Sequence, residues 1–425
     1  MASSSSSLLI VHSCSFLLVV FSYAAKTAPF PFLKVTKDAI TLQYITQVSQ
    51  RTPLVPVNLT IDLGGEFVWV NYQRDYTSST YRPAICGSPQ CKLLNTTSCQ
   101  TLCLSEPSLG CSNNTCTTFP SNTISHSGTG GLIHGDVFGT YSTDGKKVLP
   151  VVTVPSFYFV CGNDLINNGL ANGVTGMAGL GRTGMSLPAQ LSSYFRFDNK
   201  FTLCLSSSTT LSGVIFFGNG PYSFLTYTPL IVNPVSESWF TGDASPKYFI
   251  GVKSINVNKK RVNGFNEGLL SINGNGLGGT SISTADPYTV LESSIYNALV
   301  DAFVTAMPKK VQRVPNVAPF GACFSSKDID NTPLGPDVPV IDLVLQSRNM
   351  WRIFGANSMV LVNKDVLCLG FVEARNDITT TISIVIGGHQ MEDNLLQFDL
   401  STSRLGFSSS LLGRSTTCAN LNLTV

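Results

Sequence analysis

The residue best placed for acid–base chemistry in this sequence is Asp62. It ends the run Val57–Asp62, in which apolar and polar residues alternate, and the pair Gly64-Gly65 follows it. Alternation with a period of two predicts a strand, and the glycine pair predicts a tight turn that presents the carboxylate at the strand's end. Hydrolysis by carboxylates needs two of them about 3 Å apart sharing one proton. Without such a partner, we expect Asp62 to keep an ordinary pKa.

A second glycine-rich turn, Gly278–Pro287, is where a partner for Asp62 would have to come from. It contains Ser283, whose hydroxyl does not ionise near neutral pH and cannot share a proton with a carboxylate. Asp286 lies three residues later and would need a changed turn to take the place of Ser283. As a nucleophile, Ser283 would need a histidine base. The four histidines form no motif with it: they are His12, His126, His134 and His389.

Short strands separated by turns dominate the chain and have to position these two glycine turns. Each half contains a strand, a tight glycine turn and another strand, which indicates a weak internal duplication. The composition, strand-rich with few helical signals, therefore predicts an all-β protein. The clearest strand patterns are Phe67–Val70, Val151–Val154, Phe157–Val160, Tyr248–Val252 and Ile382–Ile386, with a closing hairpin at Leu395–Phe407.

Helical signals are confined to two places. Ser186–Leu191 carries a proline in what would be the first turn of a short helix. Thr289–Glu292 has the spacing of a capping box, and Ile295, Leu299 and Phe303 after it share one helical face. We therefore expect a few short helices beside the strands.

Length and composition set the domain count and exclude some partners. The chain has 425 residues, 12% charged and 43% hydrophobic, and a formal net charge of +2. That length suits two domains, and the charge gives no reason to expect a nucleic-acid partner. Residues 1–25 read as a signal peptide with an apolar stretch at Leu8–Val20, too short for the alternative of a membrane anchor. We expect lobes at 26–220 and 247–425, joined by a connection at 221–246.

The cysteines favour disulfides over a metal site. Twelve are present, and once Cys14 of the leader is set aside, eleven remain, so one thiol has no partner. Their spacing matches no zinc pattern, and a secreted chain favours disulfides. We expect no metal and no cofactor. The cluster that we expect to be stapled locally comprises Cys86, Cys91, Cys99, Cys103, Cys111 and Cys116.

Sequons for N-glycosylation also fit a secreted protein. Candidate acceptors are Asn95, Asn113 and Asn422, each followed two residues later by threonine. Asn58 has the same pattern but lies inside a predicted strand, where a glycan would meet the sheet.

Several of these motifs together resemble the pepsin-like aspartic proteases. Leu59–Gly65 followed by Phe67–Trp69 resembles the first active-site turn, Gly176–Gly181 the glycine signature of the first lobe, and Ile384–Gly388 the closing pattern. The resemblance spans residue 40 to the end and implies a bilobal pepsin-like fold with a central cleft. Aligned through Gly278–Thr280, the second catalytic aspartate falls on Ser283.

Further departures from the active enzymes point the same way. Leu63 stands where they carry a hydroxyl residue, and Ala285 replaces a turn glycine. The flap tyrosine is missing, since no tyrosine lies between Tyr81 and Tyr141. We therefore expect Asp62 and Ser283 to be vestigial and the protein not to be an enzyme.

The resemblance is closer to a plant extracellular branch: xyloglucan-specific endoglucanase inhibitors, extracellular dermal glycoprotein and basic 7S globulin. Ser78–Pro83, Pro319–Phe324, Ile386–Gln390 and Thr416–Asn420 carry it. It implies inhibition of secreted glycoside hydrolases by arginines on two loops, because a guanidinium can pair with the carboxylates of such enzymes. The first of these arginine positions is Pro333, and in the second loop Arg414 lies one place early.

The same resemblance implies the pairs Cys204–Cys418 and Cys323–Cys368. It also implies a cysteine at position 72, where this chain has tyrosine, so that Cys161 is the expected free thiol.

The leading hypothesis is a secreted inhibitor of microbial endo-β-glucanases, xyloglucanase or xylanase, in the plant cell wall (apoplast). One alternative is a storage or peptide-binding protein like basic 7S globulin, with a peptide as partner. The other is a weakly active aspartic endopeptidase.

Overall fold

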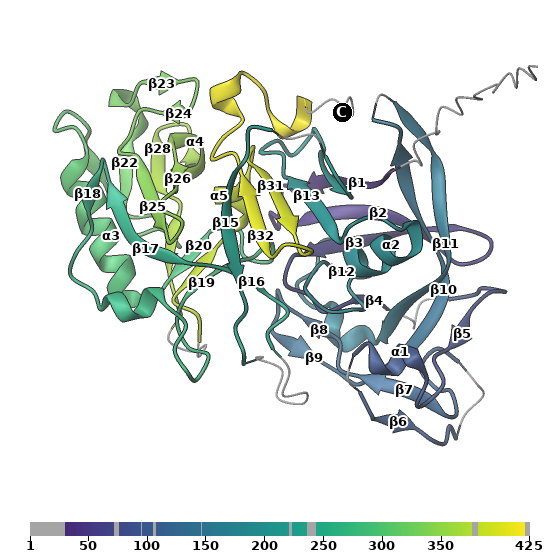
Figure 1. Ribbon diagram of the computed structural model, residues 1–425. Helices are drawn as coiled ribbons and strands as arrows, with labels where there is room; N and C mark the ends of the chain where they lie inside the picture. Colours follow the sequence, from purple (N-terminus) through teal and green to yellow (C-terminus); the bar gives the residue numbers. More distant parts are fainter. Residues whose placement is uncertain are drawn as a thin grey trace, which may run out of the picture.

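The computed structural model describes residues 30–71, 76–94, 96–104, 108–145, 147–220, 223–235, 244–375 and 381–420. The predicted signal peptide 1–25, the candidate acceptors Asn95 and Asn422, and Tyr72 lie outside these residues. Two strand-rich lobes lie side by side, with the strands nearest the C-terminus between them (Figure 1). No helix in the described ranges is long and apolar enough to cross a membrane.

The N-terminal lobe is built around a long, bent hairpin. Strands β10 and β11 pair along most of their length, with two register shifts, and β2 pairs with both β1 and β3. Residues of β2 alternate between buried and partly exposed positions, as its period of two requires. The main strands are β1 (Phe30–Lys37), β2 (Tyr44–Gln50), β3 (Val55–Asp62), β4 (Val68–Asn71), β10 (Gly131–Thr143), β11 (Val148–Gly162) and β12 (Gly176–Gly179).

Short elements cover the lower part of this lobe in Figure 1. The disulfide-rich module contains β5 (Arg82–Pro83), α1 (Pro89–Lys92), β6 (Cys99–Gln100) and β7 (Thr115–Thr118). A small hairpin of β8 (Ser121–Asn122) and β9 (Ser127–Gly128) follows it, and beyond lie η1 (Asp164–Asn167) and α2 (Leu187–Phe195).

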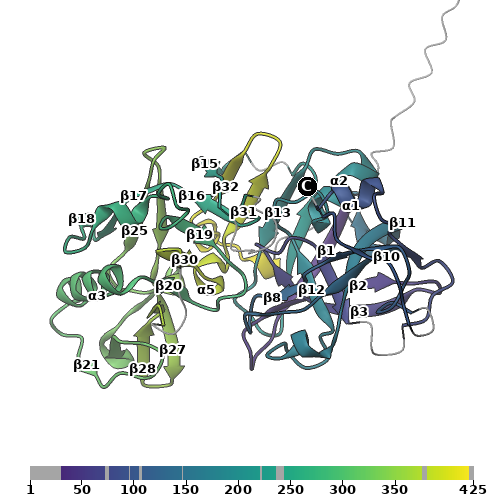
Figure 2. The same ribbon diagram turned by 90° about the horizontal axis from the view of Figure 1, so that it is seen from below.

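The C-terminal lobe has its helix on the outer side. Figure 2 shows α3 (Ser293–Ala306) at the edge farthest from the N-terminal lobe, and its apolar face lies in the core. The strands are β16 (Tyr248–Ile250), β17 (Val252–Val257), β18 (Lys260–Arg261), β19 (Thr280–Ile282), β20 (Thr289–Leu291), β21 (Arg313–Val314), β22 (Cys323–Ser325), β23 (Asn331–Thr332), β24 (Gly335–Pro336), β25 (Ile341–Leu345), β26 (Met350–Ile353), β27 (Met359–Asn363), β28 (Val366–Leu369), β29 (Phe371–Glu373) and β30 (Ile384–Ile386). The shorter helices are η2 (Glu267–Leu270), η3 (Ser326–Asp328), α4 (Gly355–Ser358) and α5 (Gly388–Met391).

The predicted duplication reappears in the strand pairing. In the N-terminal lobe β3 runs parallel to β12, which is antiparallel to β4. In the C-terminal lobe β19 runs parallel to β30, which is antiparallel to β20. Gly176 and Gly179 are required at this crossing, because a Cβ would lie 2.0 Å from the Trp69 carbonyl oxygen and 2.2 Å from that of Phe67. Both glycine turns are thus set at equivalent places.

A sheet shared by both lobes joins them. Strand β13 (Lys200–Cys204) pairs with β14 (Gly213–Phe217) on one side and β31 (Leu395–Asp399) on the other. β31 continues to β32 (Arg404–Phe407) and β15 (Thr226–Ile231), which confirms the predicted closing hairpin. The rings of Phe201 and Phe398 stack across β13 and β31 with centroids 4.8 Å apart.

The predicted capping box is wrong. Thr289 belongs to strand β20 rather than to a helix start. Helix α3 begins at Ser293, and the Glu292 side chain is its N-cap, accepting hydrogen bonds from the backbone N–H groups of Ser294 and Ile295. A glutamate can take this role because its carboxylate reaches the free N–H groups of the first turn.

Candidate functional site

The carboxyl group of Asp62 is buried at the end of β3. Its side chain is 4% exposed. Oδ1 accepts a hydrogen bond of 3.2 Å from the Gly64 N–H, and Oδ2 accepts one of 3.0 Å from the Thr123 hydroxyl. Gly65 allows this close turn, because a Cβ there would lie 2.8 Å from Oδ2. The carboxylate is therefore enclosed by its own turn and by the segment that contains Thr123.

Burial raises the pKa of Asp62. The Thr123 hydroxyl, the charge of Lys247 and the turn N–H groups act in the opposite direction and do not cancel it. The prediction of an ordinary pKa for a lone Asp62 is wrong, because desolvation penalises the ionised form even where no second carboxylate is close.

The second glycine turn reaches the first through Thr284. Its hydroxyl donates to the Ile61 carbonyl oxygen at 2.7 Å and accepts from the Leu63 N–H at 3.0 Å. The side chain of Leu63 is apolar and fully buried, so it offers no hydroxyl for the reciprocal contact. The two turns are thus joined by the Thr284 hydroxyl, without a matching side-chain hydrogen bond from Leu63.

Ser283 lies on the loop that follows β19. Its hydroxyl accepts a hydrogen bond of 3.1 Å from the Ala285 N–H within its own turn, and its N–H donates to the Ile386 carbonyl oxygen. Asp286 accepts from the Gly388 N–H through its backbone carbonyl. What the turn can offer at position 283 is a neutral hydroxyl, which cannot take part in the proton sharing that a carboxylate pair requires.

The hairpin β8–β9 is fastened over Asp62, a feature that the sequence did not reveal. Asn122 is fully buried; its amide donates to the carbonyl oxygens of Ile166 (2.8 Å) and Asn168 (2.9 Å). The Asn122 carbonyl oxygen accepts from the Ile124 and Ser125 N–H groups, so the amide is fully satisfied. The only available signal was that asparagine often forms such local turns.

A third anchor holds the base of the same hairpin. The Trp69 indole N–H donates to the Ser121 carbonyl oxygen at 3.0 Å. Together with the amide of Asn122 and the hydroxyl of Thr123, this fixes both the base and the tip of the hairpin to the body of the lobe. The hairpin consequently covers the carboxyl group of Asp62.

Five disulfides occur among the described cysteines. They are Cys86–Cys99, Cys91–Cys116, Cys103–Cys111, Cys204–Cys418 and Cys323–Cys368. Over the described residues, no group of three His, Cys, Asp or Glu side chains could hold a metal ion.

Cys161 is a free, buried thiol on β11. Its Sγ lies 3.1 Å from Nδ1 of His134, whose Nε2 lies 3.2 Å from the Tyr81 hydroxyl. Burial raises the pKa of the thiol well above its usual value and lowers the pKa of His134 to about 4. Both groups are therefore neutral at ordinary pH, and the thiol is not activated as a nucleophile.

The two candidate inhibitor loops lie next to each other. Pro333 is exposed at the turn between β23 and β24, and Arg414 is exposed in η4 (Leu412–Arg414). A Cβ on Gly413 would lie 3.6 Å from Cδ2 of Leu334, so the loops are in contact distance. In Figure 1 both loops are at the top of the molecule and β8–β9 is at the bottom. The structure thus separates this surface from Asp62.

Arg414 is held in place by an aromatic ring. Its guanidinium carbon lies 4.2 Å from the centroid of the Phe224 ring, a cation–π contact. A guanidinium stacked in this way keeps its N–H groups at the edge, where they can meet a carboxylate.

Two of the four sequons lie in the described part of the chain. Asn113 is exposed, and its Oδ1 accepts from the Cys103 N–H, an interaction that a glycan on Nδ2 would leave intact. Asn58 lies in β3, paired with β2, and its side chain hydrogen-bonds with Gln47 and with the carbonyl of Gly173.

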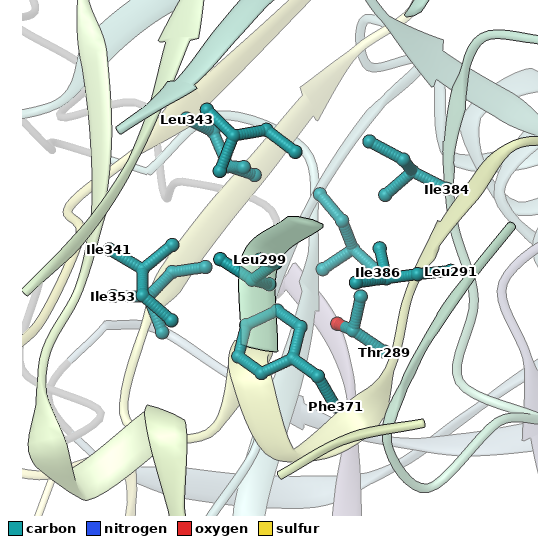
Figure 3. Close-up of a pocket in the computed structure, with 10 residues that line it drawn as sticks. Thr289, Leu291, Leu299, Ile341, Leu343, Ile353, Phe371, Ile384 and Ile386 are labelled. Carbon is teal, nitrogen blue, oxygen red and sulfur yellow. The ribbon is translucent and has the colours of Figure 1, made fainter. Parts of the chain in front are cut away.

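The enclosed cavity in the C-terminal lobe is not a ligand site. It measures about 10 Å³, and Figure 3 shows aliphatic side chains around it, with Phe371 and Thr289. That is about the room of one water molecule, and an apolar lining gives a water nothing to bind. A second, open groove of about 410 Å³ lies beside hairpin β23–β24; its lining includes Asn331, Pro336, Ala356, Leu361 and Lys364.

Comparison with known proteins identifies the family. A family model described as xylanase inhibitor N-terminal matches residues 44–219, and one described as xylanase inhibitor C-terminal matches residues 247–409. The chain belongs to this xylanase-inhibitor family. Its membership and its bilobal, pepsin-like, mostly β fold, both predicted from the sequence, are confirmed.

Relatives in the xylanase-inhibitor family carry different names. A protein of Nicotiana benthamiana named probable aspartic proteinase GIP2 is 52% identical over 428 residues, 97% of each chain. Gamma conglutin 1 of Prunus dulcis is 43% identical over 402 residues, 92% of this chain and 89% of that protein.

Solved structures agree with this family assignment. The crystal structure of edgp has a TM-score of 0.89 at 52% identity, covering 92% of this chain and 98% of that one. Basic 7S globulin from soybean has a TM-score of 0.80 at 35% identity, covering 92% and 98%.

Proposed function

We propose that this chain is a secreted, catalytically inactive aspartic-protease-like protein that inhibits microbial endo-β-glucanases, xyloglucanase or xylanase, in the plant cell wall. The observation that carries the proposal is the exposed surface formed by the Pro333 and Arg414 loops. Arg414 is exposed, and its guanidinium lies over the Phe224 ring. Retaining glycosidases carry two catalytic carboxylates about 5 Å apart, with which a guanidinium can form paired hydrogen bonds.

Two features of the cleft support the absence of peptidase activity. Ser283 occupies the position where a second carboxylate would be needed, and its hydroxyl is engaged in its own turn. Hairpin β8–β9 covers Asp62 through Thr123 and is anchored by the buried amide of Asn122. The first feature removes the acid–base pair, and the second obstructs the approach of a peptide.

The number of disulfides supports secretion. Five bridges in one chain are typical of an oxidising compartment. We propose that residues 1–25 are removed on export, that the lobes comprise 26–220 and 247–425, and that exposed Asn113 carries a glycan. Mass spectrometry of the protein secreted from plant cells would give both the N-terminus and the glycan mass.

The test of inhibition is a panel of purified microbial xyloglucanases and xylanases titrated with the full secreted chain. We expect at least one enzyme to be inhibited at micromolar protein or below. Arg414→Ala should weaken that inhibition at least tenfold, because a charged, paired contact is lost. The matched control is Arg82→Ala, an exposed arginine on the disulfide-rich module, which should change nothing. Inhibition of no enzyme, or equal effects of both variants, would refute the proposal.

Pro333 favours a second candidate, a storage or peptide-binding protein. It stands at one of the two positions where the inhibitor surface would use an arginine. In addition, relatives of this chain are named gamma conglutin and basic 7S globulin. Pro333→Arg distinguishes the two, because it should strengthen glycosidase inhibition only if this surface already docks on the enzyme. A peptidase assay at acid pH with pepstatin addresses the remaining alternative, a weak endopeptidase; we expect no pepstatin-sensitive cleavage.

A further inference from the structure

The segment that carries Arg414 is a short surface loop with buried ends. Leu411 and Cys418, at its two ends, are 0% and 2% exposed, whereas residues 413–415 between them are exposed. The position of the loop that carries Arg414 therefore depends on what holds these two ends.

One residue, Asp393, holds both ends of the loop. Its backbone carbonyl accepts a hydrogen bond of 2.7 Å from the Leu411 N–H. Its carboxylate Oδ1 accepts one of 2.8 Å from the Cys418 N–H. Asp393 is 4% exposed and has a φ of 49°, a left-handed backbone that aspartate and asparagine adopt more readily than most residues. Asp393 thus contacts both ends of the loop, one through its carboxylate and the other through its backbone carbonyl.

Asp393 also fastens the loop to the segment that leaves β13. Its Oδ2 accepts from the Ser207 hydroxyl at 2.7 Å, and its N–H donates to the Leu205 carbonyl oxygen at 2.8 Å. The disulfide Cys204–Cys418 ties the same two segments together. The Pro333 hairpin has a different support: the Ala356 N–H of α4 donates to the Leu334 carbonyl oxygen at 2.9 Å. The two loops that make up the surface are therefore supported independently.

We propose that Asp393 is a positioning residue of the inhibitory surface: it fixes the 411–418 loop so that Arg414 stays over Phe224 and Gly413 stays beside Leu334. The expected effect on inhibition rests on the proposed function, whereas the role of Asp393 in holding the 411–418 loop does not. A loop that is ordered before docking loses less freedom on binding, so releasing it weakens the complex without removing any contact residue.

The experiment compares Asp393→Ala with Asp393→Asn in the full secreted chain. Asparagine keeps an oxygen for the Cys418 N–H, can place its amide against the Ser207 hydroxyl and tolerates the left-handed backbone, whereas alanine does none of these. Hydrogen exchange of residues 411–418 is the first measurement. We expect exchange to accelerate at least tenfold in the alanine variant and to stay near wild type in the asparagine variant.

The second measurement is the inhibition constant against an enzyme that the wild type inhibits. It should rise about tenfold for Asp393→Ala, and the same change should add little in an Arg414→Ala background, since both act through one arginine. Unchanged exchange in Asp393→Ala overturns the positioning role. Faster exchange with an unchanged inhibition constant overturns its importance for inhibition.

These outcomes are separable from a failure of the proposed function. If the wild type inhibits no enzyme, the proposed function fails, while hydrogen exchange still decides whether Asp393 holds the loop. If Asp393→Ala does not fold, Ser207→Ala removes the hydroxyl contact with Oδ2 and keeps the backbone contact of Ser207. Exchange in the same residues should still accelerate, and no acceleration there overturns the inference.

Discussion

Replacing Glu392 by glutamine is expected to lower the free energy of unfolding by about 3 kcal/mol. Glu392 caps the end of α5, and its side chain is 3% exposed. Lys37 and Tyr44 approach it from the N-terminal lobe: Lys37 Nζ lies 2.5 Å from Oε1, and the Tyr44 hydroxyl donates to the same oxygen at 2.8 Å. His389 Nδ1 lies 3.1 Å from Oε2. The carboxylate therefore joins the two lobes at a desolvated point.

The magnitude follows from what glutamine leaves behind. An acceptor oxygen remains for Tyr44, but the charge facing Lys37 is lost, and the Lys37 side chain is only 13% exposed. Removing one partner of a buried pair typically costs 3–5 kcal/mol, and the partial exposure of Lys37 places this case at the lower end. The matched control is Asp330→Asn, since Asp330 and Lys310 form a pair that is 79% and 61% exposed. That change should stay within about 0.5 kcal/mol.

The effect should depend on pH in a defined direction. Burial alone would raise the pKa of Glu392, but the hydrogen bond and charge of His389 and the charge of Lys37 outweigh it and lower the pKa below its usual value. A lowered carboxyl pKa gives stability that is present above the unfolded value and is lost as pH falls through the folded one. Urea unfolding should thus show the largest gap between wild type and Glu392→Gln near pH 7 and a shrinking gap below about pH 4.

The reasoning would be refuted by a difference of less than about 1 kcal/mol between Glu392→Gln and the control at pH 7, or by a gap that widens in acid. A double-mutant cycle with Lys37→Met should return a coupling energy of at least about 1 kcal/mol.

Three further predictions concern buried groups and are checked by urea unfolding. Asp62→Asn should be as stable as wild type or more stable at pH 7, because the raised pKa means that ionised Asp62 destabilises the fold. The difference in stability should vanish in acid, and a loss of more than about 1 kcal/mol in the free energy of unfolding would contradict a vestigial role. Asp136→Asn should cost about 2–3 kcal/mol, since this 1% exposed carboxylate accepts from the Tyr76 and Thr80 hydroxyls, and an amide would turn a donor toward one of them. His134, with its pKa lowered to about 4, should take roughly 3 kcal/mol from stability as pH falls from 6.5 to 4, because the unfolded state gains the proton first; His134→Gln should abolish this contribution, and an unchanged slope would refute it.

Much of the fold could be predicted from the sequence because strand patterns are local. The alternation at Val57–Asp62 and the pattern of the closing hairpin at Leu395–Phe407 each depend on residues close together in the chain. Gly176 and Gly179 differ, because each is required by the backbone of Trp69 or Phe67 on a strand that is distant in sequence. The capping box failed because Thr289 is drawn into a sheet by pairing with Phe371, a distant strand that local spacing does not reveal.

The candidate site was less predictable where it depends on distant backbone. The partners of the Asn122 amide are the carbonyl groups of Ile166 and Asn168, and a carbonyl group carries no sequence signal. The raised pKa of Asp62 has a similar origin, because it depends on how much of the carboxyl group the hairpin covers. Contact between the Leu334 and Gly413 loops is a matter of tertiary packing as well.

The disulfide between Cys204 and Cys418 has a consequence for proteolysis. It closes a covalent ring over 214 positions of the chain, and this ring contains residues 247–418 of the C-terminal lobe and the expected connection at 221–246. A protease that cuts once anywhere between the two cysteines opens the ring without separating the pieces. The disulfide keeps both fragments linked, and after a cut between β13 and β31 the pairing of these two strands also holds them together. A protein cut once would therefore migrate as one species in denaturing electrophoresis until a reducing agent is added. Its surface loops would stay attached to the molecule after the backbone is cut.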